Sequence, residues 1–301
     1  MSKNQINKYV WLVETLYRAK KITLKEINRK WTETELSEGE EIPRRTFHTW
    51  KNAVEEMFGL VIMCDKSDDR YYIENRDDLE ENGFQRWLLN TISVNNTLLE
   101  NKALSGRILL ENIPSGQDFL ATVLEAMKKS KLLEITYKGF WSDSEHTFPV
   151  APYCVKLFRQ RWYMVGNRVY EDKIRIYSLD RVLEAQLSEE TFKYPKKFSP
   201  ENYFKSCFGI IHDEDCPIET VKLKVDANQA NYLRSLPLHL SQKELVHTGE
   251  YSIFSVEVRP TFDFQQELLW NGDALEVLEP LWLRKEMAGM AKRMWNNYSK
   301  K

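Results

Sequence analysis

Long hydrophobic runs are missing from this sequence of 301 residues. No apolar run approaches the roughly 20 residues that a bilayer-spanning helix needs, and the N-terminus MSKNQINKYV has no apolar signal core. The net charge is only −2, so the composition gives no overall sign of a nucleic-acid partner, and any such site must be a local patch. We therefore expect a soluble, cytoplasmic protein that has no membrane partner.

Motifs of the common enzyme classes are also missing. There is no GxGxxG, GxxxxGK or GxSxG string, which argues against a dinucleotide site, a P-loop and an α/β-hydrolase. The five histidines and four cysteines lack metal-ligand spacing, and buried thiols in a reducing compartment fit the cysteines better than disulfides. The acidic stretch Asp213–Asp215 is interpreted as a solvated linker, with a nonspecific cation site as the alternative. For the chain as a whole, an unrecognised nuclease or phosphodiesterase is the alternative from the enzyme classes. The sequence thus predicts no catalytic residue, no metal site and no cofactor.

The length of the chain and its lack of internal repeats predict two or three domains. The first, over residues 1–75, begins with a helix of apolar residues at helical spacing, and Thr23 with Glu26 forms a capping-box pattern for a second helix. A third helix is expected from Arg44 to about Phe58, between a proline and a glycine. Two strand-like runs follow, so this order predicts a winged helix-turn-helix DNA-binding domain.

The third predicted helix carries the candidate DNA contacts. Its opening turns contain no acid, and basic residues at a helix start can reach phosphates and base edges. The candidate DNA-binding residues are Arg44, Arg45, Thr46, His48, Thr49, Lys51 and Asn52. The alternative is a small helical bundle with an ordinary polar face, because residues 1–75 hold equal numbers of basic and acidic side chains. We favour DNA binding, since most of these acids lie outside the helix start.

Four further segments follow the first domain. Residues 76–130 keep a helical pattern that is broken at Pro114 to Gly116, which predicts a helical connector. Residues 131–192 hold several short strands, the pattern of a small antiparallel barrel. A linker is expected at residues 193–215. Residues 216–301 alternate strands and helices, which predicts a two-layer α+β module.

The strand-rich block contains a predicted hairpin, YCVKLFRQRWYMV, from Tyr153 to Val165. If Arg159 and Gln160 form the turn, residues that pair across it share a face. The expected core face then holds Val155, Leu157, Trp162 and Met164. The other face, cationic and aromatic, holds Lys156, Phe158, Arg161 and Tyr163. The alternative is a half-solvated strand pair whose Lys and Arg side chains only extend along it to water.

The string RWYMVG, which begins at Arg161, resembles the signature of the WYL family of bacterial regulators, with Met164 where the family usually has Leu. The strings ITYKG and Pro152-Tyr153 upstream, and IRIYSLDRV downstream, resemble the first, the proline-containing and the closing strands of that family. The resemblance implies a multidomain α+β protein. Its parts would be a winged helix-turn-helix head, a helical connector with dimer contacts, an SH3-like or Sm-like barrel and a ferredoxin-like C-terminal extension.

The resemblance also implies an effector site in the barrel. In the family the corresponding positions form a pocket for nucleotide-like or single-stranded nucleic-acid effectors, and Arg and Tyr side chains suit phosphate and base. The candidate effector-binding residues, taken from the resemblance and from the hairpin face, are Tyr137, Tyr153, Lys156, Arg161, Tyr163, Arg175, Ser178 and Arg181. Trp162 is expected in the core, and Asp180 is expected to pair with an arginine.

Two functional hypotheses follow. The first is a ligand-responsive transcriptional regulator that binds a duplex DNA operator as a homodimer and changes its affinity when an anionic effector fills the barrel. The second is a single-stranded nucleic-acid-binding accessory module, or a regulatory subunit of a nucleic-acid enzyme, that uses the barrel as its main contact. A palindromic footprint on duplex DNA would favour the first, and binding that needs only single strands would favour the second.

Overall fold

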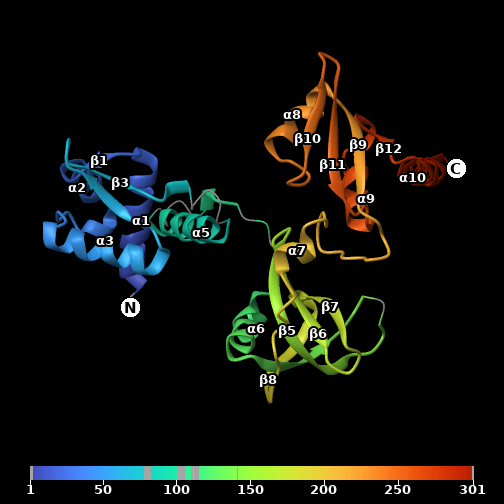
Figure 1. The fold of residues 1–301 in the computed structure, drawn as a ribbon, viewed down its shortest axis with the longest axis horizontal. Coiled ribbons are helices and arrows are strands. Elements are labelled where there is room, and N and C mark those ends of the chain that lie inside the picture. Colours follow the sequence, from blue (N-terminus) through green and yellow to red (C-terminus); the bar gives the residue numbers. More distant parts are fainter. Residues whose placement is uncertain are drawn as a thin grey trace. The chain divides into compact units, whose positions relative to one another are not determined.

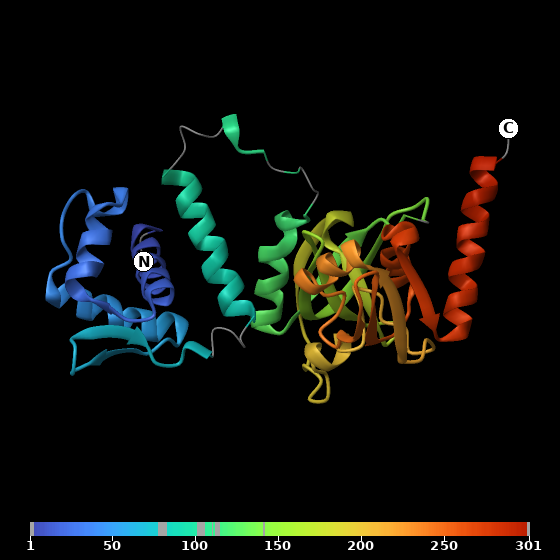
Figure 2. The same cartoon turned by 90° about the horizontal axis from the view of Figure 1, so that it is seen from above.

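The chain forms two compact units, Met1–Glu111 and Asn112–Lys301 (Figures 1 and 2). The structure, a computed structural model, describes residues 3–77, 83–100, 106–109, 111, 115–140 and 142–299. These residues form a mixed α/β protein whose strands pair antiparallel in three sheets. None of the helices in these ranges is both long and apolar enough to cross a bilayer.

The N-terminal unit consists of helices and one small sheet. Its elements are α1 (Lys3–Ala19), β1 (Ile22–Thr23), α2 (Leu24–Thr32), η1 (Glu35–Ser37), α3 (Arg44–Phe58), β2 (Ile62–Asp65), β3 (Arg70–Ile73) and α5 (Gly83–Glu100). The three strands lie in the order β1-β3-β2. Strand β1 was not predicted, because two residues are too few to show a strand pattern.

Local signals fix the ends of α2 and α3. The Glu26 amide donates to Thr23 Oγ1 at 3.2 Å and the Thr23 amide donates to Glu26 Oε2 at 3.0 Å, which confirms the predicted capping box. Helix α3 starts after Pro43 and ends at Gly59, whose φ of +64° lies in the left-handed region that glycine adopts without strain. The candidate DNA-binding residues therefore lie on one regular helix.

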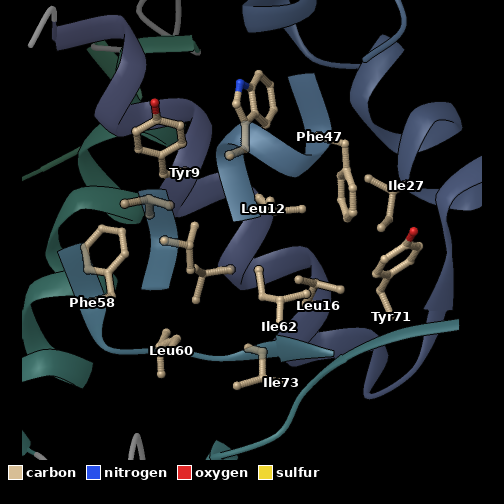
Figure 3. Packing of buried hydrophobic residues seen from close by; sticks show 14 of the residues in the cluster. Tyr9, Leu12, Leu16, Ile27, Phe47, Phe58, Leu60, Ile62, Tyr71 and Ile73 are labelled. Atoms are coloured by element: carbon tan, nitrogen blue, oxygen red, sulfur yellow. The ribbon is translucent and has the colours of Figure 1, made fainter. Parts of the chain in front are cut away.

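Apolar side chains from α1, α2, α3 and the strands meet in a single core (Figure 3). Leu12 and Leu16 of α1, Ile27 of α2 and Phe47 of α3 are all fully buried in it. Helix α5 joins the same core through Leu89, which is also buried. The first half of the predicted connector thus belongs to the N-terminal unit, because its apolar side chains pack there.

The second unit begins with a helix and a five-stranded sheet. Its first elements are α6 (Gln117–Lys129), β4 (Lys131–Tyr137), β5 (His146–Phe158), β6 (Arg161–Arg168), β7 (Lys173–Ser178), η3 (Leu179–Arg181) and β8 (Val182–Thr191). The strand order is β7-β6-β5-β4-β8. The connector was expected to extend to residue 130, but α6 buries Val123 and Ala126 in the hydrophobic cluster of this sheet. Helix α6 is therefore part of the sheet's own core.

A second sheet follows in the same unit. Its elements are β9 (Glu219–Asp226), α8 (Ala227–Ser235), β10 (Lys243–His247), β11 (Tyr251–Val258), α9 (Phe262–Trp270), η4 (Gly272–Ala274), β12 (Leu275–Glu279) and α10 (Leu281–Ser299). The strand order is β10-β11-β9-β12. Strand β10 was not predicted, because all its residues are exposed and show no alternation. Helix α10 extends beyond the sheet, and residues 291–299 are all exposed (Figure 2).

Residues 193–215, here named the covering segment, pack against the first sheet and are not the free linker that was expected. Lys156 of β5 donates to the Gly209 carbonyl at 2.6 Å, and Asp263 of α9 accepts from the Ile210 amide at 3.0 Å. A Cβ on Gly209 would lie 2.6 Å from Asp263 Oδ2 and 2.8 Å from the Phe158 ring, so only glycine fits at this close approach. The segment also contains a short helix, α7 (Pro200–Phe204).

Candidate functional site

Helix α3 presents its candidate residues on the outward side of the N-terminal unit. The exposed ones are Arg44, Arg45, His48, Thr49 and Asn52, and Thr46 and Lys51 are half-buried. Within the part of the chain that the structure describes, Arg44, Arg45 and Lys51 form no ion pair. The helix start is therefore a surface whose cations have no internal partner.

The hairpin β2–β3 of the same unit differs from α3. Asp65 accepts from Lys21 at 2.8 Å, and Asp68 lies 3.5 Å from Arg70. Hydrogen bonds from Lys21 and Ser67 hold the pKa of Asp65 well below its usual range. Two acids of this hairpin are thus paired with cations of the same unit, whereas the start of α3 is an open basic surface.

In the second unit, the predicted hairpin register is confirmed. Arg159 and Gln160 form the turn with φ values of +48° and +64°, and Leu157 pairs with Trp162 while Lys156 pairs with Tyr163. Met164 is fully buried and Trp162 is half-buried against the same cluster. Leu157 was expected in the core but is 38% exposed, because the hydrophobic cluster does not extend as far as this residue next to the turn.

The opposite hairpin face was expected to be open to ligand, and this expectation is wrong. Lys156 lies 3.9 Å from the Phe204 ring of the covering segment, and burial lowers the pKa of its ammonium group. Tyr153 packs against Phe192 and Phe198, and its exposure is 7%. Two other candidates, Tyr163 and Ser178, are also buried. The covering segment therefore packs on Lys156 and Tyr153, and the face is not the open ligand surface that the hairpin alone would form.

The candidate arginines do not form one site. Tyr163 pairs with Ser178 and Gly166 pairs with Arg175, so strand alternation places Arg161 and Arg175 on opposite faces of the sheet. Arg161 lies 3.5 Å from Asp180, which confirms that Asp180 pairs with an arginine. Arg181 stacks 4.3 Å from the Phe140 ring at the sheet edge. The single cationic face predicted from the sequence is not formed.

One hollow gathers polar and aromatic groups at the end of the core-facing side of this sheet. We name it the arginine hollow, and its volume is about 280 Å³. It is lined by Tyr137, Gly139, Ser142, His146, Phe148, Arg168, Arg175, Ile176 and Tyr177. It includes two of the predicted effector residues, Tyr137 and Arg175. Among the residues that the structure describes, no group of three or more His, Cys, Asp or Glu side chains is placed to hold a metal ion.

The two arginines of the hollow share one carboxylate. Glu171, in the turn between β6 and β7, lies 2.7 Å from Arg168 Nη1 and 3.2 Å from Arg175 Nη2. The Arg168 guanidinium also stacks 4.1 Å from the centre of the Phe148 ring. Two forked cations close to aromatic rings can bind an anion that carries a planar base, if that anion displaces the carboxylate.

Tyr177 provides an unsatisfied group in the hollow. Its side chain is 5% exposed, and within the described part of the chain its hydroxyl is buried without a hydrogen-bond partner. Burial raises the pKa of Tyr177 to about 12, while Arg168 and Arg175 act in the opposite direction. A buried hydroxyl without a partner costs free energy, which a bound acceptor would recover.

Several residues of the hollow were missed from the sequence, although part of the signal was present. Tyr177 lies two residues from Arg175, and Arg168 lies four from the buried Met164, so a strand period of two places all four on one face. His146 and Phe148 could not be found in this way. A bulge between Pro152 and Cys154 shifts the alternation of β5 before it reaches them.

Comparison with protein families identifies both halves of the second unit. Residues 118–187 match the WYL domain and residues 217–295 match the WCX domain. The chain therefore contains a WYL domain that is followed by a WCX domain. The arginine hollow lies entirely within the WYL match.

Two solved structures are similar to the chain over most of its length. Proteasome accessory factor B/C (PafBC) of Arthrobacter aurescens is 17% identical with a TM-score of 0.36. The matched region covers 94% of this chain and 45% of the PafBC chain. A CRISPR Cas-related protein is 13% identical with a TM-score of 0.40, and the matched region covers 91% of this chain and 70% of that protein's chain. The chain thus spans less than half of the length of PafBC, and both TM-scores are below 0.5, so neither likeness bears on function. No curated protein matches the chain.

Proposed function

We propose that this chain is a ligand-responsive transcriptional regulator that acts by binding and not by catalysis. In this proposal the N-terminal unit is a winged helix-turn-helix in which α3 enters the major groove of a duplex operator and β2–β3 is the wing. The WYL sheet closes as an SH3-like or Sm-like barrel, and the WCX part is a ferredoxin-like module.

The open basic start of α3 carries the proposal. Arg44 and Arg45 are exposed, and they have no carboxylate partner in the described residues. A cation without an internal partner can exchange its water and counterions for DNA phosphates or guanine edges at no cost in broken ion pairs. The order of three helices followed by a hairpin, with α3 packed through Phe47 and Val54, supports the same assignment.

The arginine hollow is proposed as the effector site. Arg168 and Arg175 would bind the phosphate of a nucleotide-like or single-stranded nucleic-acid ligand, and the rings of Phe148 and Tyr137 would contact its base. This assignment retains Tyr137 and Arg175 from the sequence prediction and adds Arg168 and Tyr177. A regulator requires that the effector bind the DNA-competent and incompetent states differently, typically by about 1–3 kcal/mol.

A homodimer completes the proposal, because a two-fold protein would bind a palindromic operator. Helix α5, within the predicted connector, is the candidate contact, since its apolar side chains Trp87 and Val94 are 39% and 57% exposed. Sedimentation of the full chain would show the dimer, and Val94→Glu should shift it toward the monomer if α5 forms the interface.

Footprinting on fragmented genomic DNA, with and without a 5′-phosphorylated pentanucleotide, tests the function. A protected duplex site with two-fold symmetry whose affinity changes with the oligonucleotide is the expected result. Protection of single strands alone would contradict the proposal and favour an accessory nucleic-acid-binding module. A duplex site that is indifferent to every nucleotide tested would leave DNA binding in place and contradict the effector assignment.

A further inference from the structure

A second hollow lies in the N-terminal unit, between α1 and α3, with a volume of about 380 Å³. Six of the residues that line it are Gln5, Lys8, Arg45, Thr46, Thr49 and Trp50. They bring an amide, an ammonium group, a guanidinium group and two hydroxyls to one place, and no Asp or Glu side chain lines it. Such a set of donors without an acceptor of negative charge suits a phosphate group.

Lys8 is held at the edge of this hollow by two tryptophans. Its Nζ lies 5.8 Å from the centre of the Trp31 ring and 6.0 Å from that of Trp50. The two rings are buried and meet edge to face at 5.1 Å. A lysine stem confined in this way loses less side-chain entropy on binding an anion than a free surface lysine does.

The hollow borders the surface of α3 that is proposed to meet DNA. Arg45 and Thr49 are one helical turn apart, are exposed, and line the hollow from the α3 side. When a helix enters the major groove, the phosphates of the two strands pass on either side of it, and side chains of neighbouring elements bind them. Lys8 and Gln5 supply such groups from α1 on one side of α3.

We propose that the hollow between α1 and α3 receives a DNA backbone phosphate, with Lys8 as its principal counter-charge. The assignment rests on the proposed function of α3 and adds α1 to the interface, a helix whose apolar spacing predicts only a contribution to the core. It predicts a contact that is independent of base sequence, because a phosphate carries no sequence information.

A purely structural role of Lys8 as a cap on the tryptophan rings is the competing explanation, and two substitutions separate the roles. Lys8→Met keeps an unbranched stem over the rings and removes the charge, whereas Lys8→Arg keeps the charge. Lys128→Met, on an exposed lysine of α6 that lines neither hollow, is the matched control. Binding of the full chain to a mixed-sequence duplex of 30 base pairs is measured by fluorescence anisotropy over a range of KCl concentrations.

In Lys8→Met, the negative slope of log affinity against log salt should become shallower by about one unit, and by the same amount for duplexes of different sequence. Its melting temperature should stay that of the wild type, and Lys8→Arg should restore the slope. An unchanged slope in Lys8→Met, or a loss that appears only with a lower melting temperature and is not restored by Lys8→Arg, would overturn the assignment while leaving the function of α3 intact. If the wild-type chain does not bind the duplex at all, the proposed function fails and this assignment fails with it.

Discussion

The basic residues of α3 and those of the arginine hollow differ in what already binds them. Arg44 and Arg45 have no ion pair in the described part of the chain, whereas Arg168 and Arg175 are both bound to Glu171. An unpaired cation attracts any polyanion, and its contribution falls with added salt. A paired cation binds only an anion that competes successfully with the carboxylate. Under the proposed function, the start of α3 would therefore attract DNA in general, and the arginine hollow would bind only an anion that displaces Glu171.

The double substitution Arg44→Ala with Arg45→Ala should have the largest effect. If both side chains contact bases, the loss of DNA affinity should be roughly 2–6 kcal/mol, since each such arginine contributes about 1–3 kcal/mol. The melting temperature should not change, because both side chains are exposed. Titration of a footprinted duplex measures the loss. Unaltered affinity with an intact fold would exclude α3 from the DNA interface, and the role given to its unpaired arginines would be wrong.

Glu171→Gln tests the second half of the comparison and should have the opposite sign. Removing the charge frees Arg168 and Arg175 while keeping the side-chain shape, so affinity for adenosine 5′-monophosphate should rise. The expected gain is about 0.5–2 kcal/mol, because two partly exposed ion pairs each contribute up to roughly 1 kcal/mol. Calorimetric titration of the nucleotide into the full chain measures it.

Two further variants make the Glu171 experiment specific. Glu190→Gln removes an exposed carboxylate that forms no ion pair within the described residues, so it should leave nucleotide affinity unchanged. Arg175→Ala should weaken binding even in the Glu171→Gln background. If Glu171→Gln binds the nucleotide no better than the wild type, the Glu171 carboxylate does not compete with the nucleotide for the two arginines, and the proposed difference between the hollow and α3 is wrong.

Tyr177→Phe should affect stability and binding in opposite directions. The hydroxyl is buried without a partner among the described residues, so its removal should raise the free energy of unfolding by about 1 kcal/mol. Nucleotide affinity should fall if the ligand supplies the missing partner. Denaturant unfolding and the same calorimetric titration measure the two effects. A destabilised variant would show that the hydroxyl already has a partner in the empty protein, and the hollow would then lose its clearest sign of a ligand.

Local sequence signals predicted α2 of the N-terminal unit and the hairpin that β5 and β6 form in the second unit. The capping box of Thr23 and Glu26 lies within four residues, and the turn at Arg159 and Gln160 sets the pairing of the residues beside it. Both features depend on the chain a few residues away, so the sequence pattern contains their causes.

The parts of the site that were not predicted depend on distant residues. Lys156 is covered by Gly209, which lies 53 positions later, and no pattern near Lys156 indicates this contact. The grouping of Arg161 with Arg175 failed for a different reason, because their faces follow from the register of β6 with β7. Arg175 and Ser178 are three residues apart on one strand and so face opposite ways, a signal that was available from the sequence.

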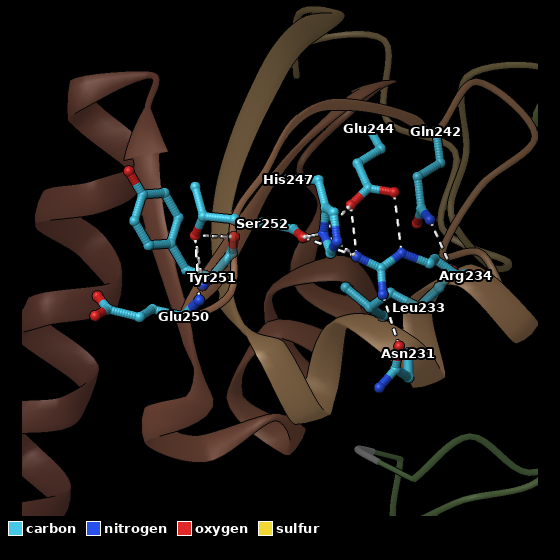
Figure 4. Close-up of polar contacts among 10 residues, drawn as sticks. Asn231, Leu233, Arg234, Gln242, Glu244, His247, Glu250, Tyr251 and Ser252 are labelled. Atoms are coloured by element: carbon cyan, nitrogen blue, oxygen red, sulfur yellow. Dashed lines mark hydrogen bonds and ion pairs between the residues drawn. The ribbon is translucent and has the colours of Figure 1, made fainter.

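Arg234 in the WCX domain sharpens the comparison, since all three of its nitrogen atoms are engaged within the protein (Figure 4). Its Nε and Nη2 donate to the two Glu244 oxygens at 3.0 and 2.6 Å, and its Nη1 donates to Asn231 at 2.6 Å. Such an arginine has little capacity left for a ligand, so we assign it a structural role. The hydrogen bonds from Arg234 and then from Ser252 lower the pKa of Glu244 to about 2.

Glu244→Gln should therefore have the smallest effect of the series, under about 1 kcal/mol of unfolding free energy at neutral pH, as is usual for exposed ion pairs. Its pH dependence is the informative part. Because folding lowers the pKa of Glu244 from its ordinary 4.5 to about 2, the stabilisation is complete above about pH 4.5 and is lost as the pH falls toward 2. The difference in denaturant midpoint between wild type and Glu244→Gln should be constant from pH 7 to 5 and should become smaller below pH 5.

The control is Glu250→Gln, which removes a nearby exposed carboxylate that has no ion pair in the described chain. This variant should give no such pH-dependent difference. A gap that persists unchanged at pH 3.5 would show that Glu244 acts through packing and not through its charge, and Arg234 would then have to be counted among the available cations.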